Sequence, residues 1–555
     1  MGTINSILIA NRGEIAARII STCRNMGIRS IAVFSDADRY APYLKDADLA
    51  VHIGLSEPTK SYLDGEKIIN AAKQYGADAI HPGYGFLAEN AGFASDVAKA
   101  GIIFIGPNPK AIEMMGSKSK AKDIMRNHNV PVVPGYQGDD QSLKTIEKEA
   151  KGMGFPVLLK AVAGGGGKGM RIVEKASELK SQLEGAKREA LSAFGNDDLI
   201  VERYFSSARH VEFQIFGDQH GNAIHILERE CSIQRRYQKV IEESPSPVLD
   251  DKTRKAMGEA AVNAAKALKY DNAGTVEFIY VSKGEFYFLE VNTRLQVEHP
   301  VTETITGLDL VKMQIESAEG KPLSIDQKDI SACGYAIECR LYAEDPSNDF
   351  LPATGKVLQW SLPEIEGLRV DTGVRSGSEI SIYYDPMIAK LITGGADRKE
   401  AIRKMRYALE NTVCTGLVTN QGFLIRLMQN EDFIKGDYDT GFLAQHPELS
   451  QTGTENIHEV LIGVAINEWY QRQEKRNYLK HMPSGWRNNF YQPQIRKYKL
   501  GEKEYELSYQ ECKGDFNIEI AKETYQVSLI NVQGKELYLE INGCQQKISL
   551  TATEE

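Results

Sequence analysis

The sequence lacks the features that mark secreted, zinc-binding and membrane-spanning proteins. Its seven cysteines are scattered and none belongs to a Cys-x-x-Cys pair, which argues against a disulfide scaffold and a structural zinc site. No run of about 18 apolar residues occurs, and no signal peptide precedes the first expected strand. We therefore expect a reduced, cytoplasmic protein with no membrane partner.

Positive charge is also scarce. The 555 residues include 66 Lys and Arg against 76 Asp and Glu, a formal net charge of -10. This balance argues against a nucleic-acid partner, although basic residues can still gather locally at a phosphate site. The length predicts three or four domains with ample core.

Two common nucleotide-binding motifs are missing. The first expected strand, 6–10, is not followed by Gly-x-Gly-x-x-Gly, so no dinucleotide site is expected there. The glycine run 164–167 does not fit a Walker A loop, which would need Gly at Val162 and Ser or Thr at Gly169. Four consecutive glycines nevertheless let backbone N–H groups close on an anion. We interpret this loop as a phosphate lid of another kind; the alternative is a flexible hairpin tip.

The two ends of the chain have different periodicities. Short apolar runs alternate with helical spacing at the N-terminal end, which predicts a parallel α/β domain with strands at 6–10, 30–34, 77–80 and 102–105. The last hundred residues begin with an amphipathic helix and then alternate apolar and polar residues. This pattern predicts a small antiparallel β-barrel with strands at 504–509, 516–520, 525–530 and 536–541.

The most informative stretch follows an expected buried strand, 284–289. Polar side chains occupy every second position after it, which on an extended backbone places them on one face. These residues are Glu290, Asn292, Arg294, Gln296 and Glu298. Burying such charges without partners costs several kcal/mol per ion, so the row is either a solvated edge or a site for a charged ligand.

A second apolar run, 274–280, contains Glu277 and can pair with strand 284–289 as a hairpin. That pairing would bring Glu277 beside Glu290. Two carboxylates and an amide oxygen are the hard ligands that hold Mg²⁺ on nucleotide phosphates. The hairpin therefore favours the ligand site over an ordinary charged edge strand.

Other candidate residues lie between the glycine loop and the hairpin. Lys118 begins a Lys-rich helix, and Glu202 ends a strand that runs into a hinge. His210 begins an alternating strand and could be a surface residue or a ligand contact. The segment 235–239 holds three cations, which indicates either a solvated basic loop or an anion site.

Together these stretches resemble biotin carboxylase, an ATP-grasp enzyme, over residues 4 to about 450. The matching segments are 10–15, 81–87, 164–169, 234–236, 290–298 and 338–340. The 81–87 turn could be structural or could line the cleft. The resemblance implies a pre-ATP-grasp Rossmann-like domain at 1–115 and an ATP-grasp domain at 116–330, with a mobile glycine-rich lid at about 133–204. A mixed α/β C-terminal domain at 331–450 and a β-rich subunit-interaction domain at 451–555 would follow.

The resemblance also implies the roles of individual residues. ATP would be held by Lys118, Lys160, Glu202, His210 and Gln234 under the lid glycines Gly165, Gly166 and Gly167. The metal, Mg²⁺ or Mn²⁺, would bind Glu277, Glu290 and Asn292. Bicarbonate would contact Lys239, Arg294, Gln296 and the backbone of Val297, with Glu298 as its general base and Arg340 at the biotin.

This assignment gives a consistent reaction. Glu298 would deprotonate bicarbonate, whose oxygen attacks the γ-phosphorus of ATP to form carboxyphosphate and ADP. Carboxyphosphate then releases CO₂ and phosphate, and the phosphate takes the proton from biotin N1′ while Arg340 stabilises the enolate form. One position departs from the family: Tyr237 stands where many members have His, and its phenol can still donate a hydrogen bond to a ribose hydroxyl.

The segment 483–488 is similar to one that follows biotin carboxylase in acyl-CoA carboxylase α chains, where the β-domain contacts carboxyltransferase subunits. No Ala/Val-Met-Lys-Met biotin-attachment sequence occurs, so we expect a separate biotin carboxyl carrier protein as partner, with a homodimer or a larger complex. The predicted function is the first half-reaction of an acetyl-CoA or propionyl-CoA carboxylase. The alternatives are a two-subunit pyruvate carboxylase, another ATP-grasp ligase such as a carbamoyl-phosphate-forming enzyme, and a non-catalytic scaffold.

Overall fold

The structure, a computed structural model, separates into two compact units, Met1–Gln451 and Thr452–Glu555. It describes residues 2–116, 118–162, 170–236, 238–282, 284–451, 456–478, 482, 484–485, 488, 492–501 and 503–552. Several predicted site residues lie outside this description: Gly165, Gly166, Gly167, Tyr237 and the side chain of Lys118. Residues 483, 486 and 487 of the segment 483–488 lie outside it as well.

The chain begins with a five-stranded parallel sheet in the order β3-β2-β1-β4-β5. Its strands are β1 (Ser6–Ile9), β2 (Arg29–Ser35), β3 (Leu49–Gly54), β4 (Ala79–His81) and β5 (Ile103–Phe104). The helices of this region are α1 (Gly13–Met26), α2 (Gly65–Tyr75), α3 (Ala91–Lys99) and α4 (Pro109–Met115). Central β1 is buried throughout, as expected for a parallel sheet covered on both faces. The predicted parallel α/β domain is confirmed.

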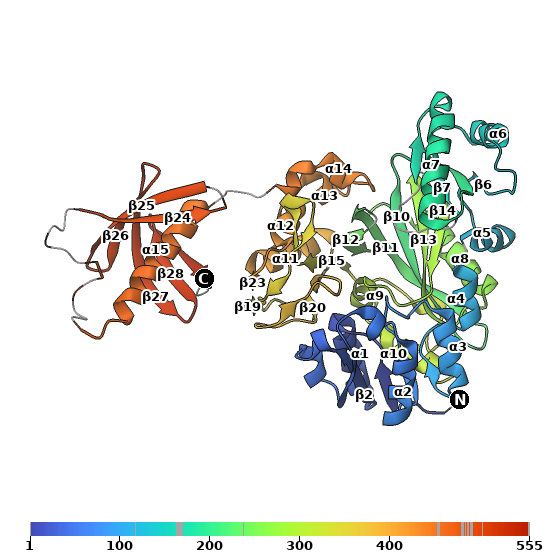
Figure 1. The fold of residues 1–555 in the computed structure, drawn as a ribbon, viewed down its shortest axis with the longest axis horizontal. Coiled ribbons are helices and arrows are strands. Elements are labelled where there is room, and N and C mark those ends of the chain that lie inside the picture. The colour runs from blue at the N-terminus through green and yellow to red at the C-terminus, as the bar shows by residue number, and fades with distance from the viewer. Residues whose placement is uncertain are drawn as a thin grey trace. The chain divides into compact units, whose positions relative to one another are not determined.

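An eight-stranded antiparallel sheet forms the middle of the first unit, in the order β14-β13-β10-β11-β12-β15-β22-β20 (Figure 1). Its strands are β10 (Arg209–Gly217), β11 (Ala223–Arg235), β12 (Gln238–Ser244), β13 (Asn272–Ser282), β14 (Glu285–Asn292), β15 (Tyr335–Tyr342), β20 (Leu368–Thr372) and β22 (Met387–Gly395). Helix α8 (Asp251–Ala267) packs on β10 and β11, and α10 (Leu310–Ala318) packs on β13. This one sheet therefore joins the strands of the polar row to the strand that carries Arg340.

A smaller layer with its own apolar core projects from the end of the unit opposite the parallel sheet (Figure 1). It is a four-stranded sheet in the order β6-β9-β7-β8, made of Gly135–Tyr136, Leu199–Arg203, Val157–Ala161 and Arg171–Val173. It includes α6 (Leu143–Met153) and α7 (Leu179–Phe194), and α5 (Lys118–Asn127) precedes it in the chain. The glycine loop lies between β7 and β8.

The last part of the first unit is mostly helical. Helix α11 (Arg398–Asn411) packs on β15 and β22, and α12 (Gln421–Gln429) packs on β15. Helix α13 (Glu431–Lys435) contacts α12, and α14 (Phe442–Gln445) contacts β11. Short strands fill the connections: β16 (Glu344–Asp345), β17 (Leu351–Pro352), β18 (Gly355–Lys356), β19 (Gln359–Ser361), β21 (Glu379–Ile380) and β23 (Val413–Thr415).

In the second unit, strands curl around one helix, α15 (Ile457–Glu474) (Figure 1). They form an antiparallel meander of β24 (Gln494–Leu500), β25 (Lys503–Cys512), β26 (Asp515–Ile520), β27 (Glu523–Gln533), β28 (Glu536–Ile541) and β29 (Cys544–Ser549). Leu461, Ile462 and Ile466 of α15 share a core with the strands. The sequence did not predict β24 and β29, which lie at the two ends of the sheet order and carry few buried residues.

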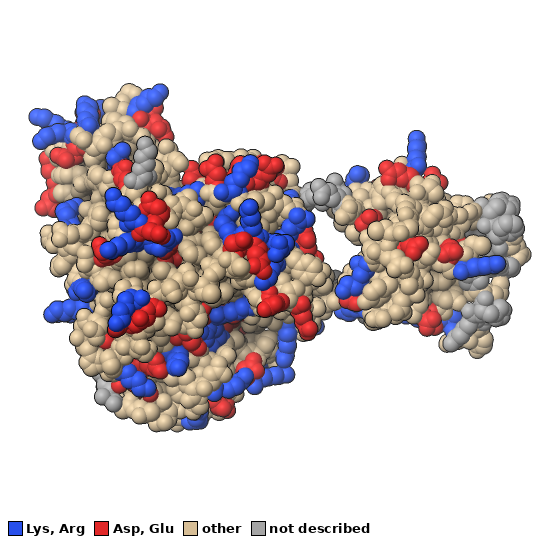
Figure 2. Space-filling view, turned by 180° about the vertical axis from the view of Figure 1, so that it is seen from behind, with Lys and Arg blue, Asp and Glu red and all other residues tan. Residues whose placement is uncertain are grey.

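Charge is distributed over the surface. On the face shown in Figure 2, basic and acidic side chains are interspersed over both units. None of the helices in the described ranges combines the length and apolar content that a membrane span requires.

Buried Glu230 predicts a pH-dependent stability. Burial raises its pKa to about 7, more than the Arg209 cation and the hydroxyls of Ser232 and Ser246 lower it. A raised folded-state pKa stabilises the fold fully below the ordinary pKa, and this stabilisation is lost as pH rises through 7. We therefore expect Glu230→Gln to raise the free energy of unfolding by about 2 kcal/mol more at pH 8 than at pH 5.

The measurement is the apparent Tm and urea midpoint of both proteins at the two pH values. Exposed Glu259 of α8 is the matched control, for which Glu259→Gln is expected to act equally at both. An equal gain at pH 5 and pH 8 from Glu230→Gln would contradict the prediction.

Candidate active site

Lys239 lies at the centre of a buried group of carboxylates. Its Nζ is 2.5 Å from Glu212 Oε2, 2.9 Å from Glu277 Oε1 and 2.6 Å from Glu298 Oε1. We refer to these three carboxylates as the carboxylate cluster. Three buried acids outnumber this one ammonium, so further cations are needed to balance their charge.

Four elements supply this group. Glu212 of β10 pairs directly with Glu277 of β13 in the sheet register, so their side chains share a face. Lys239 is the second residue of β12, and Glu298 directly precedes α9 (His299–Thr306). The alternation of β10 explains the arrangement, because Val211, Phe213 and Ile215 enter the core beneath α8 while the intervening residues turn to the opposite face.

Electrostatics keeps Glu298 ionised. Burial alone would raise the pKa of Glu298, but the cations of Lys239, Arg340 and Arg229 hold it well below its ordinary value. The same balance acts on Glu277, whose pKa Lys239 and His210 lower despite burial. Two members of the carboxylate cluster are therefore carboxylates at neutral pH, able to accept a proton or hold a cation.

Two buried arginines hold the cluster from the neighbouring strands. Arg340 of β15 places Nη2 3.0 Å from Glu298 Oε2 and also pairs with Glu242 of β12. Arg229 of β11 has a fully buried side chain whose Nε is 2.6 Å from Glu212 Oε1. Burial would lower the pKa of Arg340, but Glu242 and its other anionic neighbours raise it well above its ordinary value. Arg340 is thus a cation that contacts Glu298, the carboxylate that Lys239 also contacts.

The predicted polar row is only partly an extended strand. β14 ends at Asn292, and residues 293–298 form a loop before α9, so the predicted alternation through Glu298 is wrong. The strand end and the loop nevertheless both contact the cluster: Nδ2 of Asn292, the last residue of β14, lies 2.8 Å from Glu277 Oε1, and Nε2 of Gln296 in the loop lies 3.3 Å from it. Arg294 Nη1 donates to Gln296 Oε1 at 2.6 Å.

The loop is fixed from the N-terminal region by Glu89. Its Oε1 accepts a hydrogen bond from the Thr293 amide at 3.0 Å, and its Oε2 lies 3.1 Å from Arg294 Nε. Asn11 donates to the carbonyls of Pro82 and Tyr84, both at 2.7 Å. The sequence left the role of the 81–87 turn open. The structure shows that the turn is closely followed by Glu89, which contacts Arg294 of the polar row.

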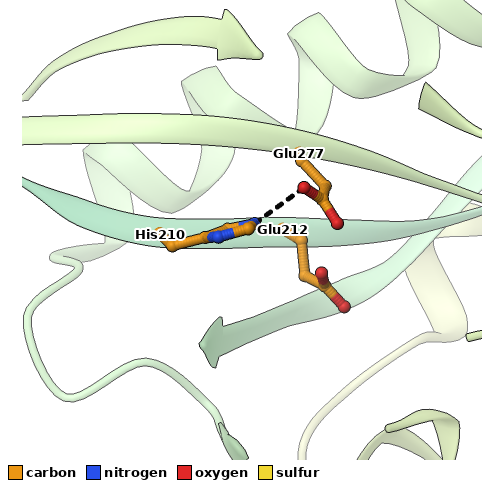
Figure 3. A group of neighbouring side chains, drawn as sticks. All are labelled: His210, Glu212 and Glu277. Carbon is orange, nitrogen blue, oxygen red and sulfur yellow. Dashed lines mark ion pairs between the residues drawn. The ribbon is translucent and has the colours of Figure 1, made fainter. Parts of the chain in front are cut away.

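The predicted metal ligands converge in part. Glu277 and Glu290 are directly opposite in the β13–β14 register, so the predicted hairpin is confirmed. Figure 3 shows His210 and Glu212 beside Glu277, with His210 Nε2 2.9 Å from Glu277 Oε2. Burial would lower the pKa of His210, but Glu277 raises it above its ordinary value. Mg²⁺ prefers oxygen ligands, so Glu277, Glu290 and Asn292 fit it better than a set containing the His210 nitrogen.

The remaining predicted residues lie in the smaller sheet or beside Lys239. Lys160 of β7 and Glu202 of β9 form a pair at 2.7 Å in the smaller sheet, where Glu202 also contacts Lys122. Gln234 lies opposite Lys239 in the β11–β12 register. Several residues of the site were missed by the sequence reasoning: Glu89, Glu212, Arg229, Glu242 and Lys390. The alternation that marked His210 could have found Glu212, since the two are neighbours on one face.

Three family models match consecutive parts of the chain. Residues 3–112 match the biotin carboxylase N-terminal domain, and residues 338–445 match the biotin carboxylase C-terminal domain. Between them, residues 117–326 match the ATP-binding domain of the carbamoyl-phosphate synthase L chain. The chain belongs to the biotin carboxylase family. Because both flanking domains match biotin carboxylase, a carbamoyl-phosphate-forming enzyme is not favoured.

Curated proteins similar to this chain include α subunits of acyl-CoA carboxylases. Methylcrotonoyl-CoA carboxylase subunit α of Rattus norvegicus is 50% identical over 473 residues, 84% of this chain and 66% of that protein. The propionyl-CoA carboxylase α chain of Homo sapiens is 50% identical over 444 residues, 80% of this chain and 61% of its own length. This chain thus spans about two-thirds of the length of these relatives.

Solved structures agree with the family assignment. One is the biotin carboxylase domain dimer of Hydrogenobacter thermophilus 2-oxoglutarate carboxylase, in complex with MgADP, ADP and bicarbonate. It has a TM-score of 0.77 and 45% sequence identity, and the match covers 82% of this chain and 100% of that one. Campylobacter jejuni biotin carboxylase in complex with β,γ-ATP has a TM-score of 0.76 at 47% identity, covering 80% and 99%. The predicted ATP-grasp biotin carboxylase fold is confirmed.

The prediction of a cytoplasmic location is contradicted by the curated relatives, which are mitochondrial proteins. The prediction rested on unpaired cysteines and the absence of a signal peptide. Neither observation distinguishes the cytosol from another reducing compartment, so the inference went further than the chemistry of the thiols allows.

Proposed function

We propose that this chain carboxylates biotin with bicarbonate and ATP, forming carboxyphosphate on the way. The observation that supports the proposal is the double contact of Glu298, whose two oxygens lie 2.6 Å from Lys239 and 3.0 Å from Arg340. A carboxylate buried between two cations is fixed in position and ionised, as a general base for a small anion requires. Its neighbours Arg294 and Gln296 supply donors for that anion.

Each remaining residue has a role that follows from its place. Glu277, Glu290 and Asn292 would hold Mg²⁺, which when bound offsets the charge that develops on the transferred phosphoryl group. Lys239 would bind bicarbonate and keep Glu212, Glu277 and Glu298 together. Arg340 of β15 would stabilise the enolate oxygen of biotin, because its guanidinium lies beside the proposed base, Glu298. Lys160, Glu202, His210 and Gln234, with Lys118, Tyr237 and the glycine lid, would hold the nucleotide.

We further propose that the chain supplies the first half-reaction of an acyl-CoA carboxylase of the methylcrotonoyl-CoA or propionyl-CoA type, in keeping with its relatives. No biotin-attachment sequence occurs among the 555 residues, so the biotin would be carried outside them, on a carboxyl carrier protein or domain. The second unit, α15 with its meander, would bind carboxyltransferase subunits. The dimer of the 2-oxoglutarate carboxylase domain supports a homodimer for the first unit.

The decisive experiment measures ATP cleavage by the purified chain with and without bicarbonate and free biotin. We expect ADP formation to depend on bicarbonate, to increase when biotin is added, and to yield carboxybiotin from ¹⁴C-bicarbonate. A non-catalytic scaffold would cleave no ATP under any of these conditions. An ATP-grasp ligase with another acceptor would respond to bicarbonate without labelling biotin.

A further inference from the structure

Lys390 is a fully buried lysine in β22 that none of the proposed roles uses. Its side chain has 0% exposure, and its Nζ donates to the Val297 carbonyl at 2.9 Å. The same ammonium lies 3.1 Å from Glu14 of α1 and 3.7 Å from Asp371 of β20. The ring of Tyr84 lies 5.8 Å from it. One cation thus joins the N-terminal segment, the 81–87 turn and the loop before α9.

The carbonyl that Lys390 contacts belongs to the peptide between Val297 and Glu298. That peptide leads directly to the α-carbon of the proposed base. It also follows the residue whose backbone is predicted to contact bicarbonate. Rotation of this peptide would therefore move the Glu298 side chain and the anion contact together, and a charge-assisted hydrogen bond resists that rotation.

The sheet places Lys390 and Arg340 side by side. The two residues are directly opposite in the β15–β22 register, so their side chains share one face. Arg340 contacts the side chain of Glu298, and Lys390 contacts the peptide before it. Glu298 is therefore held at two points by two neighbouring cations, one through its carboxylate and one through its backbone.

Glu14 supplies the charge that lets Lys390 be buried. Its carboxylate is buried in the first turn of α1, in the segment 10–15 that the sequence singled out. A buried ammonium without such a partner would carry a large desolvation cost. Asp371 is already paired with Arg369 at 2.8 Å, so Glu14 is the main counterion of Lys390.

We propose that Lys390, held by Glu14, is a positioning residue that orients the Val297–Glu298 peptide for bicarbonate binding and deprotonation. This inference rests on the proposed biotin carboxylation. It gives the segment 10–15 a function, since the N-terminal region would secure the base through a buried ion pair that reaches across the domain boundary.

Two variants separate positioning from stability. Lys390→Met removes the ammonium but retains the length of the side chain, and it leaves Glu14 buried without its cation. The double variant Glu14→Gln, Lys390→Met removes both charges. We expect Lys390→Met to lower both Tm and bicarbonate-dependent kcat/KM, the latter about 100-fold because a small displacement of a reacting group has this cost. We expect the double variant to regain most of the Tm but little of the kcat/KM.

Further measurements identify the step affected. The Kd of MgADP should change less than twofold in both variants, while the KM for bicarbonate rises. Lys404→Met is the matched control. Lys404 of α11 also donates to a backbone carbonyl, that of Gly394, which lies on β22 like Lys390 but outside the site. If the double variant regained the wild-type kcat/KM together with its Tm, Lys390 would be structural only and the inference would fall. Failure of the proposed function would appear differently, as wild-type protein that shows no bicarbonate-dependent ATP cleavage.

Discussion

Replacing Glu298 by Gln is expected to reduce bicarbonate-dependent ATP cleavage and carboxybiotin formation by about 1,000-fold. The amide has nearly the shape of the carboxylate but cannot accept the proton of bicarbonate. The wild-type carboxylate, by contrast, is ionised at neutral pH because Lys239 and Arg340 lower its pKa against the effect of burial. The measurement is steady-state kinetics with bicarbonate varied, together with the Kd of MgADP, which should stay within about threefold of the wild type.

The control is Glu410→Gln in α11, an exposed glutamate that lies outside the site and contacts Arg406 at 2.7 Å and Gln429 at 3.4 Å. This variant should keep wild-type kinetics. If Glu298→Gln retained full activity, the assignment of Glu298 as the base would be wrong. If it lost nucleotide binding as well, the loss of activity would be due to a disturbed site and not to the missing base.

The hairpin that carries the metal ligands could be predicted because its signals are local. The β-branched and aromatic residues of β13 and β14 and the turn between them place Glu277 opposite Glu290, as the register has it. The strand itself does not continue beyond Asn292, contrary to the prediction. Pro300 in the first turn of α9 indicates a helix start at this point, so the preceding residues belong to a loop and not to a strand.

The partners of the base could not be predicted because they come from distant strands. Arg340 and Lys239 approach Glu298 only when β12 and β15 pair in the long sheet, where Glu242 and Glu338 are directly opposite. No local periodicity encodes such a pairing, because both faces of these central strands are covered and their burial does not alternate. Lys239 and Arg340 were predicted as site residues from the family resemblance and not from periodicity.

The sheet ends of the second unit were missed for a different reason. β24 and β29 are rich in Lys, Arg and Gln and have few buried side chains, so the apolar alternation that marks β25 and β28 is absent from them. Charged side chains on edge strands discourage pairing with other chains. The polar side chains that protect these strands also make them hard to predict from the sequence.

Replacing Lys239 by Met is expected to cost about 3–5 kcal/mol of folding free energy, because it leaves three buried carboxylates without their common cation. It should also reduce bicarbonate-dependent activity at least about 1,000-fold, since bicarbonate loses a contact and Glu298 loses one of its two cations. Burial raises the pKa of Glu212 even in the wild type, so the variant is expected to take up protons on folding near neutral pH.

Urea denaturation at several Mg²⁺ concentrations distinguishes the cause. Because Mg²⁺ brings positive charge to the same carboxylates, it should stabilise Lys239→Met more than it stabilises the wild type, without restoring activity. The matched control is Lys435→Met, which removes a lysine from the exposed pair with Glu431 at 2.9 Å and should leave stability and kinetics unchanged. If Lys239→Met unfolded like the wild type, the buried ammonium would not be what holds the three acids together, and their other partners, among them Arg229, Arg340 and His210, would have to stabilise the cluster.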